Sequence, residues 1–165
     1  MIIRRLERAF ARRCGMLLIK NAYVIDPKSG HTGKNDILAD FGRVQKIGKD
    51  LPVPEGCEVI EAEGLAAAPG LVDVHVHFRD PGFPDKEDIL TGAAAAKKGG
   101  FTTVIMMANT KPSIDNTETL RYCLKKCRET GIRVLACANV TVGMKGKELT
   151  DMERLYAAGA VGSFF

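Results

Sequence analysis

The chain has 165 residues, of which 45% are hydrophobic and 27% are charged, and its formal net charge is +4. Its length suits one ordinary domain and excludes two complete large ones. No apolar run approaches the roughly 20 residues that a transmembrane helix needs, so we expect no membrane association. The positive excess falls within the first fifteen residues, and the balanced remainder has no basic stripe, so we expect no nucleic-acid partner.

Residues 1–15 form an arginine-rich segment that differs from the rest of the chain. Ile2, Leu6 and Phe10 could line one face of a short amphipathic helix, as in an organelle presequence or a helix on a membrane surface. The segment is short and lacks serine, which favours a third interpretation, an upstream leader included by a mistaken start. We therefore expect Met16 to be the true first residue.

Residues 16–69 have the sequence pattern of a small β domain. Short apolar runs separated by Gly, Pro and Asp are typical of antiparallel strands joined by turns. We expect a β-sandwich-like domain with strands at LLIKNAYVI, DILADF, RVQKIG and CEVIEAEG. His31 falls in the polar stretch SGHTGKN, where we expect a turn and a solvated side chain rather than a metal ligand.

The pattern changes at Pro69-Gly70, after which strands and helices alternate. We predict strands over 71–78, 101–108 and 132–141, and helices over 86–100, 116–131 and 150–159. Such alternation implies a parallel sheet with right-handed crossovers, as in a doubly wound sheet or a (β/α)₈ barrel.

Helix boundaries in this half are marked by residues that cap helices. Gly99 and Gly100 should stop the first helix, and Gly131 should end the second. Thr150 precedes Glu153 by three residues, which is the spacing of a capping box at the start of the third.

The strand over 71–78 contains two of the three histidines of the chain. Side chains on a strand alternate between its faces, so His75 and His77 should share one face with Asp73. The opposite face should then be a row of valines that packs under helices. Two imidazoles about 7 Å apart along a strand could grip one metal ion. Because zinc takes three or four protein ligands, the pair alone leaves a hydrogen-bonded structural role equally open.

Two further polar residues follow the ends of predicted strands. Arg79 continues the parity of the histidines and could bind a carboxylate with its guanidinium fork. Asn109 falls at the end of the next strand, where its amide could bind the same anion. Taken singly, each could instead be an ordinary loop residue, a solvated arginine or a turn-forming asparagine.

Five cysteines are scattered along the chain without a CxxC pair. Their odd number and the lack of a signal peptide indicate reduced thiols, and we expect a cytoplasmic protein. Cys123 and Cys127 share a helix face and could chelate a metal ion, but no second pair completes a zinc site. We interpret both as ordinary, partly buried thiols.

The motifs PGLVDVHVHFRDPG and KEDILTGAAAAKKGGFTTVIMMANTKP resemble the dihydroorotases of the amidohydrolase superfamily, particularly the long-chain bacterial type. The resemblance runs from about residue 17 to 162. It implies a partial (β/α)₈ TIM-type barrel over 70–165, with three βα units and the start of strand four, behind the small β domain.

The resemblance also implies a function and roles for the site residues. Such enzymes interconvert N-carbamoyl-L-aspartate and (S)-dihydroorotate in de novo pyrimidine biosynthesis. His75 and His77 would be zinc ligands in what is a binuclear site in the family. Arg79 and Asn109 would bind the substrate carboxylate, and Asp73 would have a supporting role at most.

The chain departs from the family at its C-terminal end, where SFF replaces the expected acidic run. The bridging carboxylate, two more histidine ligands and the general acid/base aspartate would fall at or beyond residue 165. We therefore expect no catalytic residue in this chain, an incomplete zinc site and no activity of the chain alone.

Two alternatives to a dihydroorotase remain open. One is a non-catalytic dihydroorotase-like partner of aspartate transcarbamoylase. Such a scaffold would not need both a pair of metal ligands, His75 and His77, and a pair of anion-binding residues, Arg79 and Asn109. The other is a different cyclic amidase, such as an allantoinase.

The resemblance also implies that a full-length enzyme would be a homo-oligomer.

Overall fold

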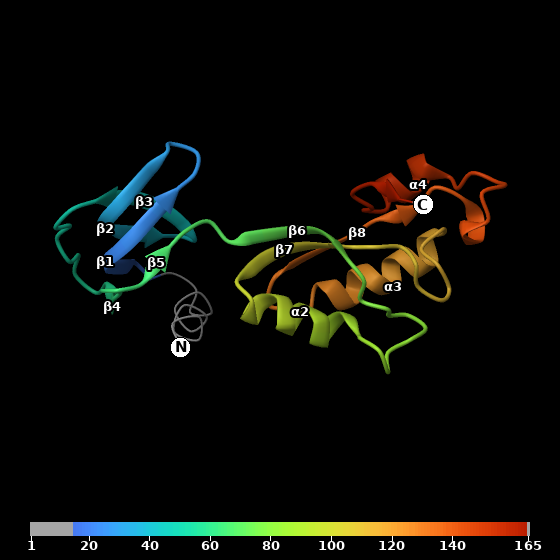
Figure 1. Cartoon of the computed structure of the whole chain (residues 1–165), viewed down its shortest axis with the longest axis horizontal. Helices are drawn as coiled ribbons and strands as arrows, with labels where there is room; N and C mark the ends of the chain where they lie inside the picture. Colours follow the sequence, from blue (N-terminus) through green and yellow to red (C-terminus); the bar gives the residue numbers. More distant parts are fainter. Residues whose placement is uncertain (1–14, 165) are drawn as a thin grey trace. The chain divides into compact units, whose positions relative to one another are not determined.

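The computed structural model describes residues 15–164, so the predicted leader segment lies outside the described residues except for its last residue. The chain divides into two units, and the boundary between them is the Pro69-Gly70 bond. Figure 1 shows a β unit before this bond and an α/β unit after it. No helix among residues 15–164 has the length and apolar character that crossing a bilayer requires.

The described part of the β unit is a single five-stranded sheet, and not the two packed sheets of the predicted β-sandwich-like domain. Its strands are β1 (Leu17–Asp26), β2 (His31–Asp40), β3 (Arg43–Gly48), β4 (Glu58–Glu61) and β5 (Ala66–Ala67). The first three pair antiparallel in the order β3-β2-β1, as predicted. β4 and β5 both pair with β1 in parallel, so the prediction of an antiparallel strand is wrong for β4, and β5 was not predicted. The connection over residues 49–57 returns the chain to the far side of β1, where the next strand runs in the same direction as β1.

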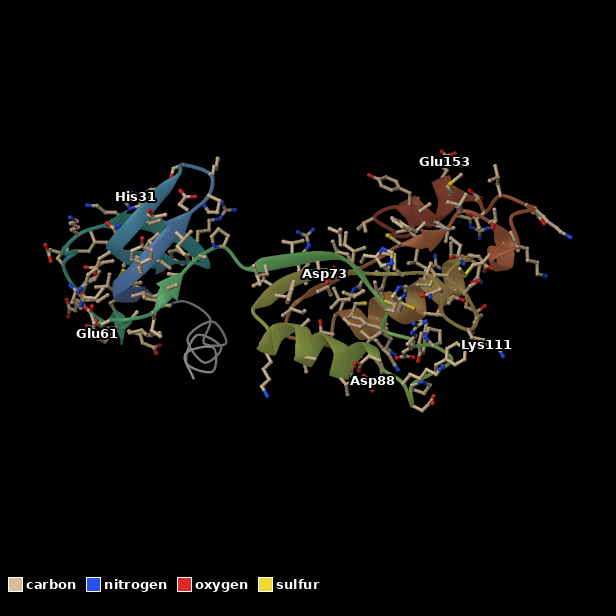
Figure 2. The ribbon with its side chains drawn as sticks, in the orientation of Figure 1. His31, Glu61, Asp73, Asp88, Lys111 and Glu153 are labelled. Carbon is tan, nitrogen blue, oxygen red and sulfur yellow. The ribbon has the colours of Figure 1, made fainter. Side chains whose placement is uncertain are left out.

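His31 lies at the start of β2 and not in a turn, because strand pairing continues to the Asp26–His31 pair. The turn is confined to residues 27–30, where Gly30 has a φ of 73°, a left-handed conformation that glycine adopts without strain. His31 is exposed, as predicted, and its Nε2 lies 2.7 Å from the amide nitrogen of Asn35. Figure 2 shows it on the β unit.

The α/β unit contains a parallel sheet in the order β6-β7-β8. Its strands are β6 (Leu71–Val76), β7 (Phe101–Met106) and β8 (Arg133–Ala136). After one intervening residue, β8 continues as β9 (Ala138–Asn139), which pairs in parallel with β10 (Ser163–Phe164). β10 thus takes the place of a fourth parallel strand.

A helix follows β6, β7 and the β8-β9 pair before the next strand begins. These helices are α2 (Ile89–Lys98), α3 (Thr117–Cys127) and α4 (Met152–Ala157), and a short 3₁₀ turn, η1 (Val142–Met144), follows β9. α2 and α3 lie on the same side of the sheet (Figure 1). This arrangement of three βα units and the beginning of a fourth strand is the predicted part of a (β/α)₈ barrel.

The core of the α/β unit lies between the sheet and its two longer helices. α2 contributes Ile89 and Ala93, and Gly92 lets it approach Phe78, because a Cβ atom on Gly92 would lie 2.5 Å from the phenyl ring. The strands and α3 contribute further core side chains, among them Val104, Met106, Val134, Leu120 and Cys123. This core holds the carboxyl ends of the strands in fixed positions.

The end of α2 agrees with the prediction, whereas its start lies three residues after the predicted one. Asp88 caps the helix by accepting a hydrogen bond from the Thr91 N–H at 2.7 Å, and Thr91 reciprocates in a capping box. Gly99 ends the helix, and Gly100 follows with a φ of 88°. Figure 2 labels Asp88 at this helix start.

The other two helix boundaries differ from the prediction. α3 ends at Cys127, four residues before Gly131, because Arg128 already forms its C-cap. α4 is capped by Asp151, whose carboxylate accepts from the Arg154 N–H at 2.9 Å. The predicted capping box is wrong, because the hydroxyl of Thr150 instead donates to the backbone carbonyl of Asn139 at 2.7 Å.

Candidate metal and ligand site

The end of β6 brings the two predicted histidines side by side. His75 lies on the strand and His77 one residue beyond its end. Their Nε2 atoms are 3.3 Å apart, and their rings meet edge-on with centroids 5.0 Å apart. Two ring nitrogens that face each other at this distance can act on the same small ligand or ion.

Asp73 forms no metal-binding group of three with this pair in the described part of the chain. The pairing of β6 with β7 shifts register between Asp73 and Val76, so simple alternation fails within the strand. The Asp73 carboxylate instead accepts a hydrogen bond from the backbone N–H of His75 at 3.0 Å. It supports the strand next to His75.

The predicted row of buried valines is also wrong in part. Val72 and Val74 are 59% and 62% exposed, and only Val76 packs against the core. The reason is that β6 is an edge strand of the β6-β7-β8 sheet, while the helical core centres on β7 and β8.

Asn109 follows β7 and contacts the histidine pair directly. Its Oδ1 lies 2.8 Å from Nδ1 of His77. An amide oxygen can only accept, so His77 must carry its proton on Nδ1, which leaves the Nε2 lone pair facing His75. Orientation of a metal-binding imidazole through its second nitrogen is a common feature of metal sites.

The geometry of the two imidazoles fits one zinc ion. Zinc–nitrogen bonds of about 2.0–2.1 Å can bridge two nitrogens up to roughly 4.2 Å apart, and the two Nε2 atoms are well within that limit. The donor set is small, however, because residues 15–164 contain no group of three or more His, Cys, Asp or Glu side chains that could hold a metal ion. His75 and His77 thus supply two of the three or four protein ligands that zinc takes.

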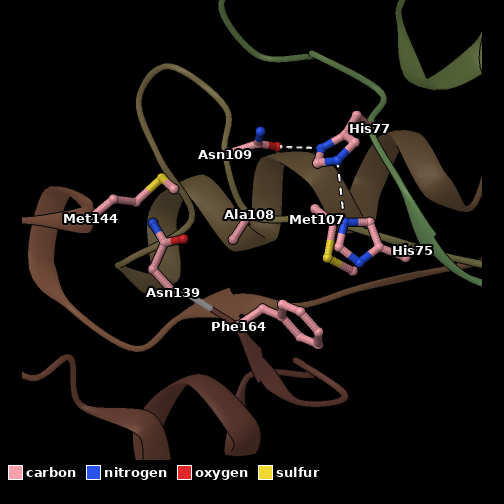
Figure 3. A pocket seen from close by; sticks show the side chains of 8 residues that line it. All are labelled: His75, His77, Met107, Ala108, Asn109, Asn139, Met144 and Phe164. Carbon is pink, nitrogen blue, oxygen red and sulfur yellow. Dashed lines mark hydrogen bonds between the residues drawn. The ribbon is translucent and has the colours of Figure 1, made fainter. Parts of the chain in front are cut away.

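A pocket of about 60 Å³ opens beside the histidine pair (Figure 3). Its volume suits an ion with a few water molecules, or part of a small ligand. One wall is the ring of Phe164 on β10, which meets the His75 ring edge-on at 5.4 Å. The lining residues are His75, His77, Met107, Ala108, Asn109, Asn139, Met144 and Phe164.

Arg79, the fourth predicted site residue, is not among the residues that line this pocket. It is half-buried and has a φ of 46°, which places its backbone in the left-handed region. Its carbonyl accepts a hydrogen bond from the Phe83 N–H at 2.9 Å, which tightens the loop after β6. The structure thus brings together three of the four predicted residues.

Asp80 anchors the Arg79 loop, a role that the sequence analysis missed. Its side chain is 4% exposed and accepts from the Tyr122 hydroxyl at 3.0 Å and from the Lys126 ammonium at 2.7 Å. The hydrogen bond to Asp80 is the main reason that the pKa of Lys126 is raised. No local pattern indicates this contact, because its partners on α3 are more than forty residues away.

Asn139 is a second residue that the sequence analysis missed. It lies on β9, is 1% exposed and lines the pocket. Its Nδ2 has no hydrogen-bond partner in the described part of the chain, a state that costs about 1–3 kcal/mol for a buried amide. Its place at the end of the third parallel strand, level with Asn109 after the second, is the signal that could have found it.

The solved structures define the class of protein. The chain is similar to L-hydantoinase (dihydropyrimidinase) from Arthrobacter aurescens, with a TM-score of 0.70 and 26% sequence identity over 89% of this chain and 32% of the hydantoinase. The fold is therefore part of the TIM-type barrel of the amidohydrolase enzymes.

Sequence comparison defines the family. The chain belongs to the dihydro-orotase-like family, whose model matches residues 64–164. It is 54% identical over 147 residues to the dihydroorotase of Clostridium acetobutylicum and 53% identical over 147 residues to that of Streptococcus pneumoniae. Each match covers 89% of this chain and 35% of the relative, so the chain spans about a third of their length. The resemblance read from the motifs is confirmed, and neither alternative class is favoured.

Proposed function

We propose that this chain carries the first metal-binding and ligand-binding strands of a dihydroorotase, a cyclic amide hydrolase. The observation that supports this most is the histidine pair, whose Nε2 atoms face each other across 3.3 Å at the end of β6. The two curated relatives are dihydroorotases, and the reaction we propose is the interconversion of N-carbamoyl-L-aspartate and dihydroorotate. We also propose the role of that reaction in pyrimidine biosynthesis.

His75 and His77 are the proposed zinc ligands. Asn109 holds His77 in the tautomer whose Nε2 is free to bind, and the backbone contact of Asp73 steadies the strand at His75. When bound, zinc supplies Lewis-acid polarisation of a carbonyl and lowers the pKa of water. A second ion, as in the binuclear family site, would need ligands that residues 15–164 do not provide.

Binding of the substrate carboxylate is the proposed role of Arg79 and Asn109. Asn109 is already at the histidine pair, and its Oδ1 is engaged with His77, so its Nδ2 is the group available to an anion. Arg79 lies in a loop that the buried Asp80 anchors to α3. A guanidinium held near the mouth of the site would orient the ring of the substrate over the histidines.

With two ligating histidines, the 165-residue chain should bind zinc weakly and show no measurable turnover. Proton transfer in amide hydrolysis also needs a general base, and we place none in this chain. We further propose a cytoplasmic location, consistent with the free thiols of Cys57, Cys123, Cys127 and Cys137. Homo-oligomerisation and contact with aspartate transcarbamoylase stay proposals that rest on the family alone.

A chimera tests the proposed function directly. Residues 64–164 would replace the equivalent segment of the Clostridium acetobutylicum dihydroorotase, and ring opening of dihydroorotate would be followed by ultraviolet absorbance with added zinc. We expect turnover by the chimera and its loss in the His75→Ala variant. Allantoin and hydantoin serve as competing substrates.

Two controls make the chimera decisive. The parent enzyme with its own segment sets the reference rate, and circular dichroism shows whether each chimera folds. A folded chimera that hydrolyses allantoin but not dihydroorotate would contradict the proposal, as would full activity after His75→Ala.

A further inference from the structure

Asn139 differs from the other polar residues of the pocket because it is buried and its amide nitrogen lacks a partner. The side chain is 1% exposed, and residues 15–164 offer no acceptor within hydrogen-bond distance of Nδ2. Buried polar groups are nearly always hydrogen-bonded. An unpaired donor such as Nδ2 of Asn139 in the wall of a pocket indicates that a bound ligand supplies the acceptor.

The backbone of Asn139 is held on both sides, so its side chain cannot reach water by a small shift of β9. Its N–H donates to the carbonyl of Ile114 at 2.8 Å, and its carbonyl accepts from the Thr150 hydroxyl at 2.7 Å. Ile114 and Thr150 are themselves buried. The fold therefore fixes the position of the unpartnered amide.

Asn139 also completes a series of polar groups at the ends of adjacent strands. The histidine pair lies at the end of β6, Asn109 after β7, and Asn139 on β9, which continues β8. Figure 3 shows the Asn139 amide pointing toward the space near Ala108 and Met144. In parallel barrels, ligands bind at this end of the strands.

We propose that Nδ2 of Asn139 donates a hydrogen bond to a carbonyl or carboxylate oxygen of a small cyclic amide acid bound beside the histidine pair. The ligand class rests on the proposed function, whereas the unsatisfied donor comes from the structure. Asn139 is then a ligand-binding residue, the third after Arg79 and Asn109. An uncharged amide donor suits either kind of oxygen without requiring a counter-charge.

Replacing Asn139 by leucine should weaken ligand binding without lowering stability. Leu has a similar volume and removes an unsatisfied buried donor, so the melting temperature should stay equal or rise. Ligand affinity should fall by about tenfold, the usual effect of losing one hydrogen bond. The matched control is Asn35→Leu in the β unit, where the amide donates to the Gly33 carbonyl and is 8% exposed. That variant should melt lower.

The experiment is nuclear magnetic resonance of the full 165-residue chain with added zinc chloride, titrated with dihydroorotate. The side-chain amide signals of Asn139 are assigned by their loss in Asn139→Leu, and the imidazole signals by His75→Ala and His77→Ala. We expect the Asn139 amide protons to shift and saturate together with the imidazole signals. Dihydrouracil, which lacks the carboxylate, separates the two oxygen sources: a shift with both ligands indicates a ring carbonyl, and a shift with dihydroorotate alone indicates the carboxylate.

Three results would overturn the inference, and they differ in what they imply for the proposed function. If the imidazole signals shift while the Asn139 amide does not, Asn139 is not a ligand-binding residue but the proposed function stands. If no pocket signal shifts at any dihydroorotate concentration, the inference fails, and the chimera decides the proposed function separately. A large drop in the melting temperature of Asn139→Leu would show that its amide is satisfied in the free chain, which also contradicts the inference.

Discussion

Each of the two units buries one aspartate beside a lysine, and the two aspartates differ in their hydrogen-bond partners. In the β unit, Asp36 accepts from the backbone N–H groups of Asn21 and Leu51 at 2.8 and 2.9 Å and pairs with Lys20 at 3.2 Å. In the α/β unit, Asp80 has only side-chain partners, both on α3. Asp36 joins β1 and the connection after β3 to β2, whereas Asp80 ties the loop of a candidate site to a helix.

Burial alone does not distinguish a carboxylate that stabilises the fold, such as Asp36, from one that positions a loop of a candidate site, such as Asp80. Both carboxylates are almost fully buried, with side chains 4% exposed. What differs is the partner: backbone amides cannot move away from Asp36, whereas the lysine beside Asp80 is 34% exposed and can turn to solvent. The predictions below test this difference.

The largest expected effect is that of Asp36→Ala. The substitution leaves two backbone amides and Lys20 without their acceptor, so we expect the β unit to lose about 3 kcal/mol of its free energy of unfolding. Urea unfolding followed by circular dichroism measures it. Asp40→Ala is the control, since the Asp40 carboxylate accepts only from the next residue's N–H and should cost far less.

Acid should weaken the β unit through the same residue. Burial raises the pKa of Asp36, but the amides of Asn21 and Leu51 and the Lys20 ammonium outweigh it, and the net pKa is lowered. Its stabilising contribution is therefore present above the unfolded value near 4 and is lost as pH falls through the lower folded value. Unfolding curves between pH 6 and about pH 2 should show this loss in the native chain and a flatter profile in Asp36→Asn; identical profiles would contradict it.

Asp80→Ala should have a smaller effect on stability, about 2 kcal/mol, because Lys126 can reach water once its partner is gone. Its second effect should be on the loop that it anchors. Amide hydrogen exchange by mass spectrometry over residues 77–88 should become faster, while exchange in the β unit stays the same. Unchanged exchange in this loop would show that Asp80 does not position Arg79.

Loss of one histidine should weaken zinc binding by at least tenfold, or about 1.4 kcal/mol. Calorimetric titration of zinc into His75→Ala and the native chain measures the difference. The matched control is His31→Ala in the β unit, where the imidazole contacts only Asn35 among the hydrogen bonds of the described chain. Equal loss in both variants would remove the proposed metal role of the pair on β6.

The smallest expected effect is that of Asp88→Ala at the start of α2. Removing the capping carboxylate should cost about 1 kcal/mol of unfolding free energy in the α/β unit. Thermal unfolding should show the decrease, with Asp85→Ala as a nearby control on the exposed loop. A change of the same size in Asp85→Ala would mean that charge, rather than capping, is responsible.

Much of the fold follows from patterns within a few residues. The order of strands and helices after Pro69, the end of α2 at Gly99, and the antiparallel pairing of the first three strands of the β unit were predicted correctly. The meeting of His75, His77 and Asn109 followed from their places at strand ends. These features depend on side-chain periodicity, turn residues and the shared direction of parallel strands.

Other predictions failed where a residue more distant in the chain competes for a group. The Thr150 hydroxyl donates to the Asn139 carbonyl instead of capping α4. That carbonyl is buried away from water, so it needs a donor from within the protein. The simple alternation of faces along β6 fails because β6 shifts register against β7 between Asp73 and Val76. Neither event has a signal in the neighbouring sequence.

The sequence by itself determined which residue types stand at the ends of the parallel strands, and hence the family and the chemistry they suit. Only the tertiary structure decided which of them meet: that Asn109 engages His77, that Asp80 reaches α3, and that Asn139 keeps an unpaired donor in the pocket. The reason is physical. Local propensities arise from contacts a few residues apart, whereas these pairings require segments tens of residues apart to pack against one core.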